Sequence, residues 1–202
     1  MWAPWHFASP PGTRPVSGRN RVSGKCCRSD PVAAKRGLGY AAEEPTFYEE
    51  LSAEEYLAFV AGVRGLEPAA ARARTLALCE RLALATRLAE PVDRFSHGMR
   101  KKLSFVAAVL HAPRVLLCDE ALEGFDVGSN LEAKAELRAL AAAGTAVLFS
   151  SHVAETVERL CDRVVLLHPG RVVRQLARAD WGAHEAGPSP LERAFLAASA
   201  GP

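Results

Sequence analysis

Three short apolar runs, separated by helical segments, constrain the fold of this chain more than any other sequence feature. The runs are Val115 to Cys118, Thr145 to Ser150 and Arg163 to Leu167, and the segments between them are residues 128–143 and 153–161. Short apolar runs of this kind are typical of buried parallel strands. A strand–helix–strand–helix–strand order predicts a parallel sheet covered by helices, and therefore an α/β fold.

The first half of the chain predicts consecutive helices without intervening strands. Ser52 begins one helix, Pro68 begins a second that runs to about Leu88, and Gly98 to His111 has the apolar spacing of a third. We expect these helices to form a subdomain at about residues 48–112. Near the other end, we expect Arg171 to Gln175 to form a hairpin with the third apolar run, and one short helix around Pro190 to Ala198.

Charge divides the chain unevenly. Residues 1–29 carry five of the 25 Lys and Arg residues and no acid, whereas the rest carries 20 basic and 23 acidic residues. We therefore expect a basic, poorly ordered segment at 1–29, a domain at 30–176 and a tail at 177–202. A basic arm can touch nucleic acid or anionic lipid, but a loosely structured terminus is the simpler interpretation, and the body of the chain is not basic enough for a nucleic-acid surface.

Cysteine usage indicates a reducing environment, and the apolar content predicts no membrane span. The five cysteines show no metal-ligand spacing, so buried thiols in a reducing cytosol are the simplest interpretation. The longest apolar stretch, Leu103 to Cys118, is interrupted by polar residues and is not expected to span a membrane.

Two carboxylates directly after the first apolar run are the strongest chemical signal. Asp119 and Glu120 follow Val115 to Cys118, and ligands of open parallel sheets bind at the carboxyl ends of the strands. One carboxylate can hold Mg²⁺, and the next can polarise an attacking water. The structural alternative is a strand that is followed by a solvated acidic loop.

A polar segment ahead of the third helix has the features of a phosphate site. Ser96 is a candidate N-cap, and Gly98 allows backbone amides to approach a ligand closely. Arg100, Lys101 and Lys102 oppose the helix dipole in the first turn, which favours the approach of an anion. The alternative is an ordinary capped helix with a basic, exposed face.

A histidine follows the second apolar run. His152 comes directly after Phe149-Ser150-Ser151, where an imidazole can contact a phosphate or an attacking water. By itself such a histidine is more often incidental.

Together, the order and spacing of these features resemble the nucleotide-binding subunit of ATP-binding cassette (ABC) transporters. The stretch FSHGMRKKLSFVAAVLHAPRVLLCDEALEGFDV is similar to the family pattern nearly position for position. FSHGM resembles the signature motif, VLLCDE the Walker B strand and EGFD the D-loop. The resemblance runs from about Arg14 to Gln175 and implies a P-loop NTPase (RecA-like) parallel sheet with a helical subdomain.

The resemblance also implies roles for individual residues. Glu120 would be the catalytic carboxylate, His152 the switch histidine, and Asp119 a ligand of Mg²⁺. Residues 39–45 are similar to the Q-loop, with Glu43 as a second metal ligand where glutamine is usual. The remaining positions would bind ATP: Ser96, Gly98 and Met99 of the signature and Asp126 of the D-loop.

The family resemblance further implies partners and a location. It implies an ATPase that uses ATP and Mg²⁺, pairs with a second nucleotide-binding subunit, and drives a transmembrane permease from the cytoplasmic face of the membrane, with no nucleic acid involved. The signature leans towards export. A DNA-repair ATPase of the same superfamily is disfavoured because no long coiled-coil insertion separates the motifs.

The phosphate-binding loop is the main departure from the family. The only candidate for G-x-x-x-x-G-K-[ST], Gly18 to Cys26, has five residues between its glycines and Cys in place of Ser or Thr, and we reject it. We therefore expect an incomplete domain without the P-loop strand and helix, and incomplete cover over residues 115–118 and 145–150. A truncated reading of a longer protein, or a non-catalytic subunit that supplies only its signature face, remains open.

Overall fold

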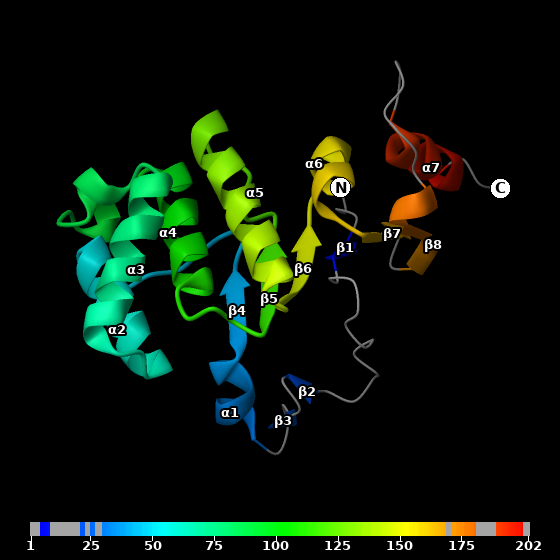
Figure 1. Cartoon of the computed structure of the whole chain (residues 1–202). Coiled ribbons are helices and arrows are strands. Elements are labelled where there is room, and N and C mark those ends of the chain that lie inside the picture. The colour runs from blue at the N-terminus through cyan, green and yellow to red at the C-terminus, as the bar shows by residue number, and fades with distance from the viewer. Residues whose placement is uncertain are drawn as a thin grey trace.

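A four-stranded sheet forms the centre of the molecule. The structure is a computed structural model, and it describes residues 5–8, 21–22, 25–26, 30–168, 171–180 and 189–199. The strand order is β1-β6-β5-β4, and the strands are β1 (Trp5–Ala8), β4 (Leu38–Ala41), β5 (Val115–Asp119) and β6 (Ala146–Ser150) (Figure 1). β5 lies between β4 and β6 and is parallel to both, so the predicted α/β fold with a parallel sheet is confirmed.

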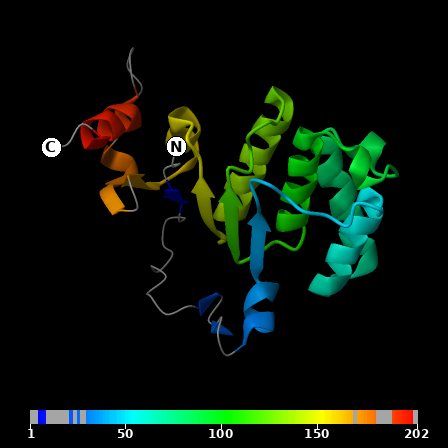
Figure 2. The ribbon, with the colours of Figure 1, turned by 180° about the vertical axis from the view of Figure 1, so that it is seen from behind.

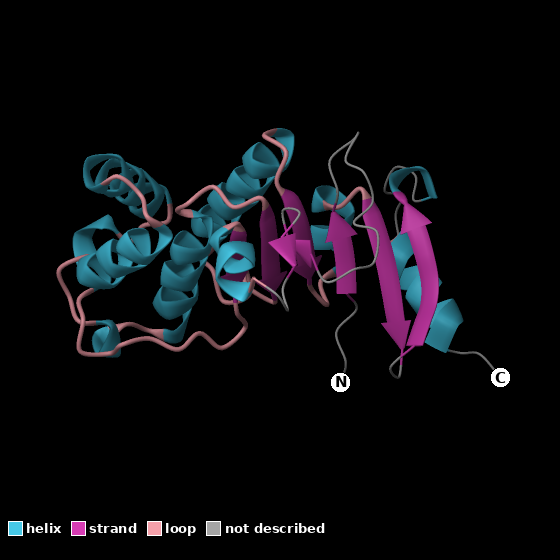
Figure 3. Ribbon diagram, turned by 90° about the horizontal axis from the view of Figure 1, so that it is seen from below, coloured by secondary structure: helices cyan, strands magenta, loops and turns pink. Residues whose placement is uncertain are grey.

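The third apolar run does not join this sheet. It forms β7 (Arg163–His168), which pairs antiparallel with β8 (Arg171–Ala177) in a separate hairpin. The outer edge of β6 is instead occupied by β1, which runs antiparallel to it and lies between β6 and β7 (Figure 3). The predicted hairpin is therefore confirmed, whereas the predicted third parallel strand is wrong because β1 takes the edge that it needed.

Three helices of the first half pack beside one another (Figures 1 and 2). They are α2 (Ala53–Arg64), α3 (Pro68–Arg81) and α4 (His97–Val109). Ser52 and Glu55 close a capping box at the start of α2, as the sequence indicates. α3 ends at Arg81 rather than Leu88, because Ala83 adopts a left-handed φ of 55° that no helix accommodates; two 3₁₀ turns follow at Ala85–Arg87 and Val92–Arg94.

The remaining helices surround the sheet and the hairpin. They are α1 (Pro31–Arg36), α5 (Val127–Ala142), α6 (Ala154–Leu160) and α7 (Pro190–Ser199), with a 3₁₀ turn at Arg178–Asp180. Only α1 is absent from the sequence prediction, although Asp30 caps it and Pro31 occupies its first turn. None of the helices in the described part of the chain is both long and apolar enough to cross a bilayer.

The rejected P-loop candidate contains a pair of very short strands. Within it, β2 (Arg21–Val22) and β3 (Lys25–Cys26) pair antiparallel, and residues 18–20 and 23–24 lie outside the described residues. The lysine of a P-loop lies where the loop enters a helix. Lys25 instead lies in a paired strand, which supports the rejection.

One apolar core connects the sheet to the helices. Leu57 of α2, Phe105 of α4 and Leu116 of β5 are fully buried. On the alternate positions of the strands, Leu117 and Leu148 are only half-buried, which agrees with the predicted incomplete cover. The free thiols Cys79, Cys118 and Cys161 are buried, and burial raises the pKa of each to about 12, so these three are inert core side chains.

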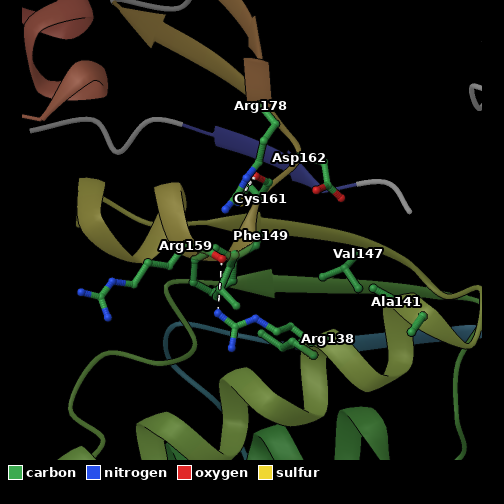
Figure 4. A pocket seen from close by; sticks show the side chains of 11 residues that line it. Arg138, Ala141, Val147, Phe149, Arg159, Cys161, Asp162 and Arg178 are labelled. Carbon is green, nitrogen blue, oxygen red and sulfur yellow. Dashed lines mark hydrogen bonds between the residues drawn. The ribbon is translucent and has the colours of Figure 1, made fainter. Parts of the chain in front are cut away.

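A cavity of about 350 Å³ lies against β6, between α5 and α6 (Figure 4). Val147 and Phe149 contribute to its apolar wall. The Arg138 guanidinium donates to the Arg159 carbonyl at 3.3 Å, and that of Arg178 donates to the Cys161 carbonyl at 3.2 Å. These two arginines therefore close the carboxyl end of α6, where backbone carbonyls lack helical partners.

Candidate functional site

The parallel register brings the predicted site residues to one edge of the sheet. Asp119 is paired with Ser150 across β5 and β6, and the Ser150 hydroxyl donates to Asp119 Oδ1 at 2.7 Å. Glu120 follows β5 and His152 follows β6, so their side chains also meet at this edge. Asp119, Glu120 and His152 therefore converge at this edge, and their chemical roles stay predictions.

The backbone of Glu120 is held on both sides. Its amide donates to the Ser150 hydroxyl at 3.1 Å, and its carbonyl accepts from Lys101 Nζ at 2.9 Å. Its φ of 46° lies in the left-handed region, which a residue with a Cβ adopts only when its surroundings enforce it. The two contacts supply that enforcement.

The side chain of Glu120, in contrast, is buried without a hydrogen bond. The residue is 5% exposed, and neither carboxylate oxygen has a hydrogen-bond partner among the described residues. His152 Nδ1 lies 3.4 Å from Glu120 Oε2 and 2.8 Å from Glu123 Oε1. Burial, and secondly the neighbouring Glu123, raise the pKa of Glu120 well above its usual value, because both disfavour a second negative charge at this edge.

The edge offers the oxygen ligands that Mg²⁺ prefers. Asp119 is half-buried and Glu43, beyond the end of β4, is exposed. After burial, the charges of Asp119 and Glu43 raise the pKa of Tyr40, and Glu43 also contributes to the raised pKa of Glu120. Asp119 and Glu43 therefore both act on Tyr40 at this edge, and carboxylate oxygens are ligands that Mg²⁺ prefers.

The start of α4 makes contacts within the chain. The Ser96 hydroxyl accepts from the Met99 amide at 3.3 Å, as a capping residue does. A Cβ at Gly98 would lie 2.7 Å from the Gly124 carbonyl oxygen, so the close approach expected at this glycine is made to the chain's own backbone. Binding of ATP at Ser96, Gly98 and Met99 stays a prediction.

Each of the three cations in α4 has a partner within the chain. Arg100 pairs with Glu49, Lys101 donates to the carbonyl of Glu120, and Lys102 pairs with Asp126. Lys101 and Lys102 are buried, at 3% and 7% exposure. Arg100 and Lys102 are therefore paired with acids far away in sequence, and Lys101 is bonded to a carbonyl. Neither the expectation that these cations await an anion nor the alternative of an exposed basic face describes them.

Asp126 connects α4 to α5. Its carboxylate accepts from Lys102 Nζ and from the amide and hydroxyl of Ser129, at 2.9 and 2.8 Å. The Lys102 ammonium is the largest cause of the lowered pKa of Asp126. Asp126 therefore caps α5 while holding α4 close to the carboxylates, and any contact with ATP would be additional.

Sequence analysis missed three residues that shape this edge. Glu123 has no family role in the prediction, although it lies three residues after Glu120 in a tight turn. Ser150 and Lys101 position the Glu120 backbone, and no local pattern shows that Lys101 reaches a carbonyl 19 residues away.

Comparisons with known proteins agree with this geometry. The family described as ABC transporter matches residues 12–123. The linearmycin resistance ATP-binding protein LnrL of Bacillus subtilis (strain 168) is 31% identical over 78% of this chain and 50% of its own length. The ABC transporter ATP-binding protein NatA of the same strain is 31% identical over 79% of this chain and 65% of its length.

One further curated relative and one solved structure also match this chain. The daunorubicin resistance ATP-binding protein DrrA3 of Streptomyces coeruleorubidus is 32% identical over 80% of this chain and 51% of its length. A solved structure described as the ATP-binding subunit of an ABC transporter shares 32% identity and a TM-score of 0.75, covering 79% of this chain and 67% of that one. The chain spans about half to two thirds of the length of these curated relatives.

Proposed function

This chain belongs to the ABC transporter family, and from that membership we propose that it serves as an ATP-binding, ATP-hydrolysing subunit of a membrane transporter. One observation carries the hydrolytic part of the proposal. Glu120 is a buried carboxylate that makes no hydrogen bond with the described residues, and it is fixed through its backbone beside Asp119 and His152. A general base needs this combination of restraint and an uncommitted proton-accepting group.

The proposal gives each carboxylate at the edge a separate task. Asp119 and Glu43 would hold Mg²⁺, which supplies charge neutralisation for the phosphates when bound. Glu120 would take the proton of the attacking water at a carboxylate oxygen, with Lys101 and Ser150 keeping its backbone in place. His152, which is largely exposed, would orient the water or the terminal phosphate from the opposite side.

The start of α4 would serve a second subunit. Ser96 caps α4, and Gly98 and Met99 lie in its first turn, at the end of a helix where phosphate groups bind. Asp126 holds this turn near the carboxylates through Lys102. We therefore propose a dimer in which this turn contacts the ATP of the partner.

The transport task follows from the relatives. LnrL and DrrA3 carry names that describe antibiotic resistance, and removal of the compound from the cell is the simplest way for an ATP-binding protein to confer it. We therefore propose that the chain powers export through a transmembrane permease, from the cytoplasmic face of the membrane. The transported compound is not assigned.

A second candidate function rests on the segment 18–26. Because β2 and β3 pair within it, it offers no loop-to-helix cradle for phosphate among its described residues. In this alternative, the chain would contribute only the first turn of α4 to an ATP that is held by another subunit.

Mixing the chain with a full-length ABC ATP-binding subunit, whose own catalytic glutamate is replaced by glutamine, tests both candidates. Under the first, ATP turnover appears on mixing, and Glu120→Gln lowers it by about 10²–10⁴-fold. The exposed Glu80→Gln is the matched control and leaves turnover unchanged. Titration of the chain alone with Mg-ATP by calorimetry reports binding separately.

The two candidates give different outcomes. The second candidate is correct if two results are obtained together. The chain alone binds no Mg-ATP, and the unaltered chain and Glu120→Gln raise the ATP turnover of a partner with an intact glutamate by the same factor. If Ser96→Arg also accelerates that partner as well as the unaltered chain does, neither candidate holds.

A further inference from the structure

The geometry points to a site for a borderline divalent metal ion, of which Zn²⁺ is the representative, formed by Glu120, Glu123 and His152. One oxygen of each carboxylate and one ring nitrogen of the histidine lie within 4.8 Å of one another. Two carboxylates and an imidazole are a common ligand set for zinc and its neighbours in the first transition row. This site is separate from the Mg²⁺ position proposed at Asp119 and Glu43.

The distances fit a tetrahedral ion. Zinc bonds to nitrogen and oxygen of about 2.0–2.2 Å place neighbouring ligand atoms about 3.4 Å apart. His152 Nδ1 lies 3.4 Å from Glu120 Oε2 and 2.8 Å from Glu123 Oε1. The shorter separation has to open, and the exposed His152 side chain can make that adjustment towards solvent, while the oxygens of the two carboxylates lie within 4.8 Å of each other.

The burial of Glu120 is an independent reason to expect a ligand. Its side chain is 6% exposed, and both oxygens lack a hydrogen-bond partner within the described part of the chain. Buried polar atoms are almost always satisfied, so an unsatisfied carboxylate calls for a missing partner. A cation between Glu120 and Glu123 would satisfy both side chains and remove their mutual repulsion.

The surroundings restrain the ligands as metal sites require. The Ser150 hydroxyl accepts from the Glu120 amide, and Lys101 Nζ donates to the Glu120 carbonyl. These contacts hold the residue without using its carboxylate, which is the arrangement by which outer groups orient a metal ligand. His152 is 62% exposed on its side chain, so an ion can enter from solvent and keep one position for water.

Occupation of the site would inhibit hydrolysis, a consequence that rests on the proposed function. The ion would bind the Glu120 carboxylate and the His152 imidazole, which would then be unavailable to accept a proton or orient water. The binding itself does not depend on that proposal, because it is a property of three side chains in this chain alone.

Direct binding measurements test the site. Zn²⁺ is titrated into the whole chain by calorimetry in excess Mg²⁺, and Co²⁺ is used as a visible probe of the ligand types. Both are done on a Cys26→Ser, Cys27→Ser background so that these thiols do not compete. We expect one equivalent of each ion to bind, with a tetrahedral cobalt spectrum that lacks a sulfur-to-cobalt charge-transfer band.

Variants connect the binding to the three side chains. Glu123→Gln should weaken Zn²⁺ affinity at least about tenfold, and His152→Asn should do the same. Glu80→Gln and His97→Asn, which alter an exposed carboxylate and an exposed imidazole elsewhere, should not change it. Circular dichroism confirms that each variant is folded.

Three outcomes would overturn the site: no stoichiometric binding by the folded chain, binding that Glu123→Gln and His152→Asn leave unchanged, or a cobalt spectrum with thiolate bands. Loss of the proposed ATPase activity is recognised separately, because it is measured with Glu120→Gln and without added zinc.

Discussion

The cations of α4 and the carboxylates after β5 lie side by side, yet they are satisfied to very different degrees. Lys101 and Lys102 are buried and each has a partner within the chain. Glu120 is equally buried, and its carboxylate oxygens have no hydrogen bond in the described structure. The comparison teaches that buried charge alone does not mark a functional group; whether its polar atoms are hydrogen-bonded does.

The energetic cost of an unsatisfied buried group explains why the difference between the lysines and Glu120 is informative. An unpaired buried polar group destabilises a fold by about 1–3 kcal/mol, so selection for stability alone would remove it. The lysines follow this rule because they fasten α4 to the segments that follow β5. Glu120 departs from it, as residues at functional sites often do.

The largest effect is expected from Lys101→Met. This change keeps the apolar stem and removes the charge-assisted bond to the buried Glu120 carbonyl, which retains only the bond from the Glu123 amide. We expect the free energy of unfolding to fall by about 3 kcal/mol, measured by urea denaturation. Lys35→Met, on an exposed face of α1, is the control and should stay within about 0.5 kcal/mol. If Lys101→Met lowered the free energy of unfolding no more than Lys35→Met does, Lys101 would contribute no more to stability than a surface lysine.

Gly98→Ala is expected to lower the free energy of unfolding by about 2 kcal/mol. The added Cβ would meet the Gly124 carbonyl at 2.7 Å, so α4 has to move away from the segment after β5. Gly62→Ala is the matched control in α2, where a Cβ has nothing within 4 Å, and there alanine should stabilise by about 0.5–1 kcal/mol. If Gly98→Ala and Gly62→Ala shifted the melting temperature in the same direction, the close approach at Gly98 would be contradicted.

Local signals account for the part of the fold that the sequence predicted. The capping residues Ser52 and Glu55 lie three positions apart and determine the start of α2 on their own. The edge position of Asp119 and His152 was also predictable, because the carboxyl ends of parallel strands meet. What could be predicted in each case depended on neighbours in sequence or on a general rule of sheet geometry.

Contacts between residues far apart in sequence account for the features that sequence analysis missed. β7 has the composition of a sheet strand, but its partner depends on β1, a four-residue strand that carries no periodic signal. The partner of Lys102 is Asp126, 24 residues away, and the sequence does not show which of many acids it meets. Glu123 was overlooked because, within the EGFD segment that it begins, the family resemblance assigned a role only to Asp126.

On the carboxylate side of the comparison, we expect a substitution to raise the free energy of unfolding rather than lower it. Glu120→Gln removes a buried carboxylate that has no hydrogen bond among the described residues, so it should stabilise the fold, by about 1 kcal/mol at neutral to alkaline pH. The sign of the pH dependence follows from the raised pKa of Glu120. Between its unfolded pKa of 4.5 and its higher folded value, the folded chain binds more protons than the unfolded chain, so stability falls as pH rises.

Urea denaturation at about pH 5 and about pH 8 tests that expectation. The advantage of Glu120→Gln over the unaltered chain should be larger at the higher pH, because only the unaltered chain loses stability in this window. Glu80→Gln, at an exposed position of α3, should show no such dependence. A Glu120→Gln variant that is less stable at both pH values would show that the carboxylate has a stabilising partner after all.

The smallest effect concerns the ion pair of Lys102 with Asp126, which sharpens the comparison because one partner is buried and the other is not. The side chain of Lys102 is 9% exposed and that of Asp126 is 58% exposed, so solvent screens the attraction. A double-mutant cycle with Lys102→Met and Asp126→Asn should give a coupling of about 1 kcal/mol. The same cycle on the pair Arg159–Glu155, exposed at both ends, should give at most about 0.5 kcal/mol. Equal couplings would mean that burial of one partner adds nothing, and that α4 is held against α5 by apolar packing rather than by this pair.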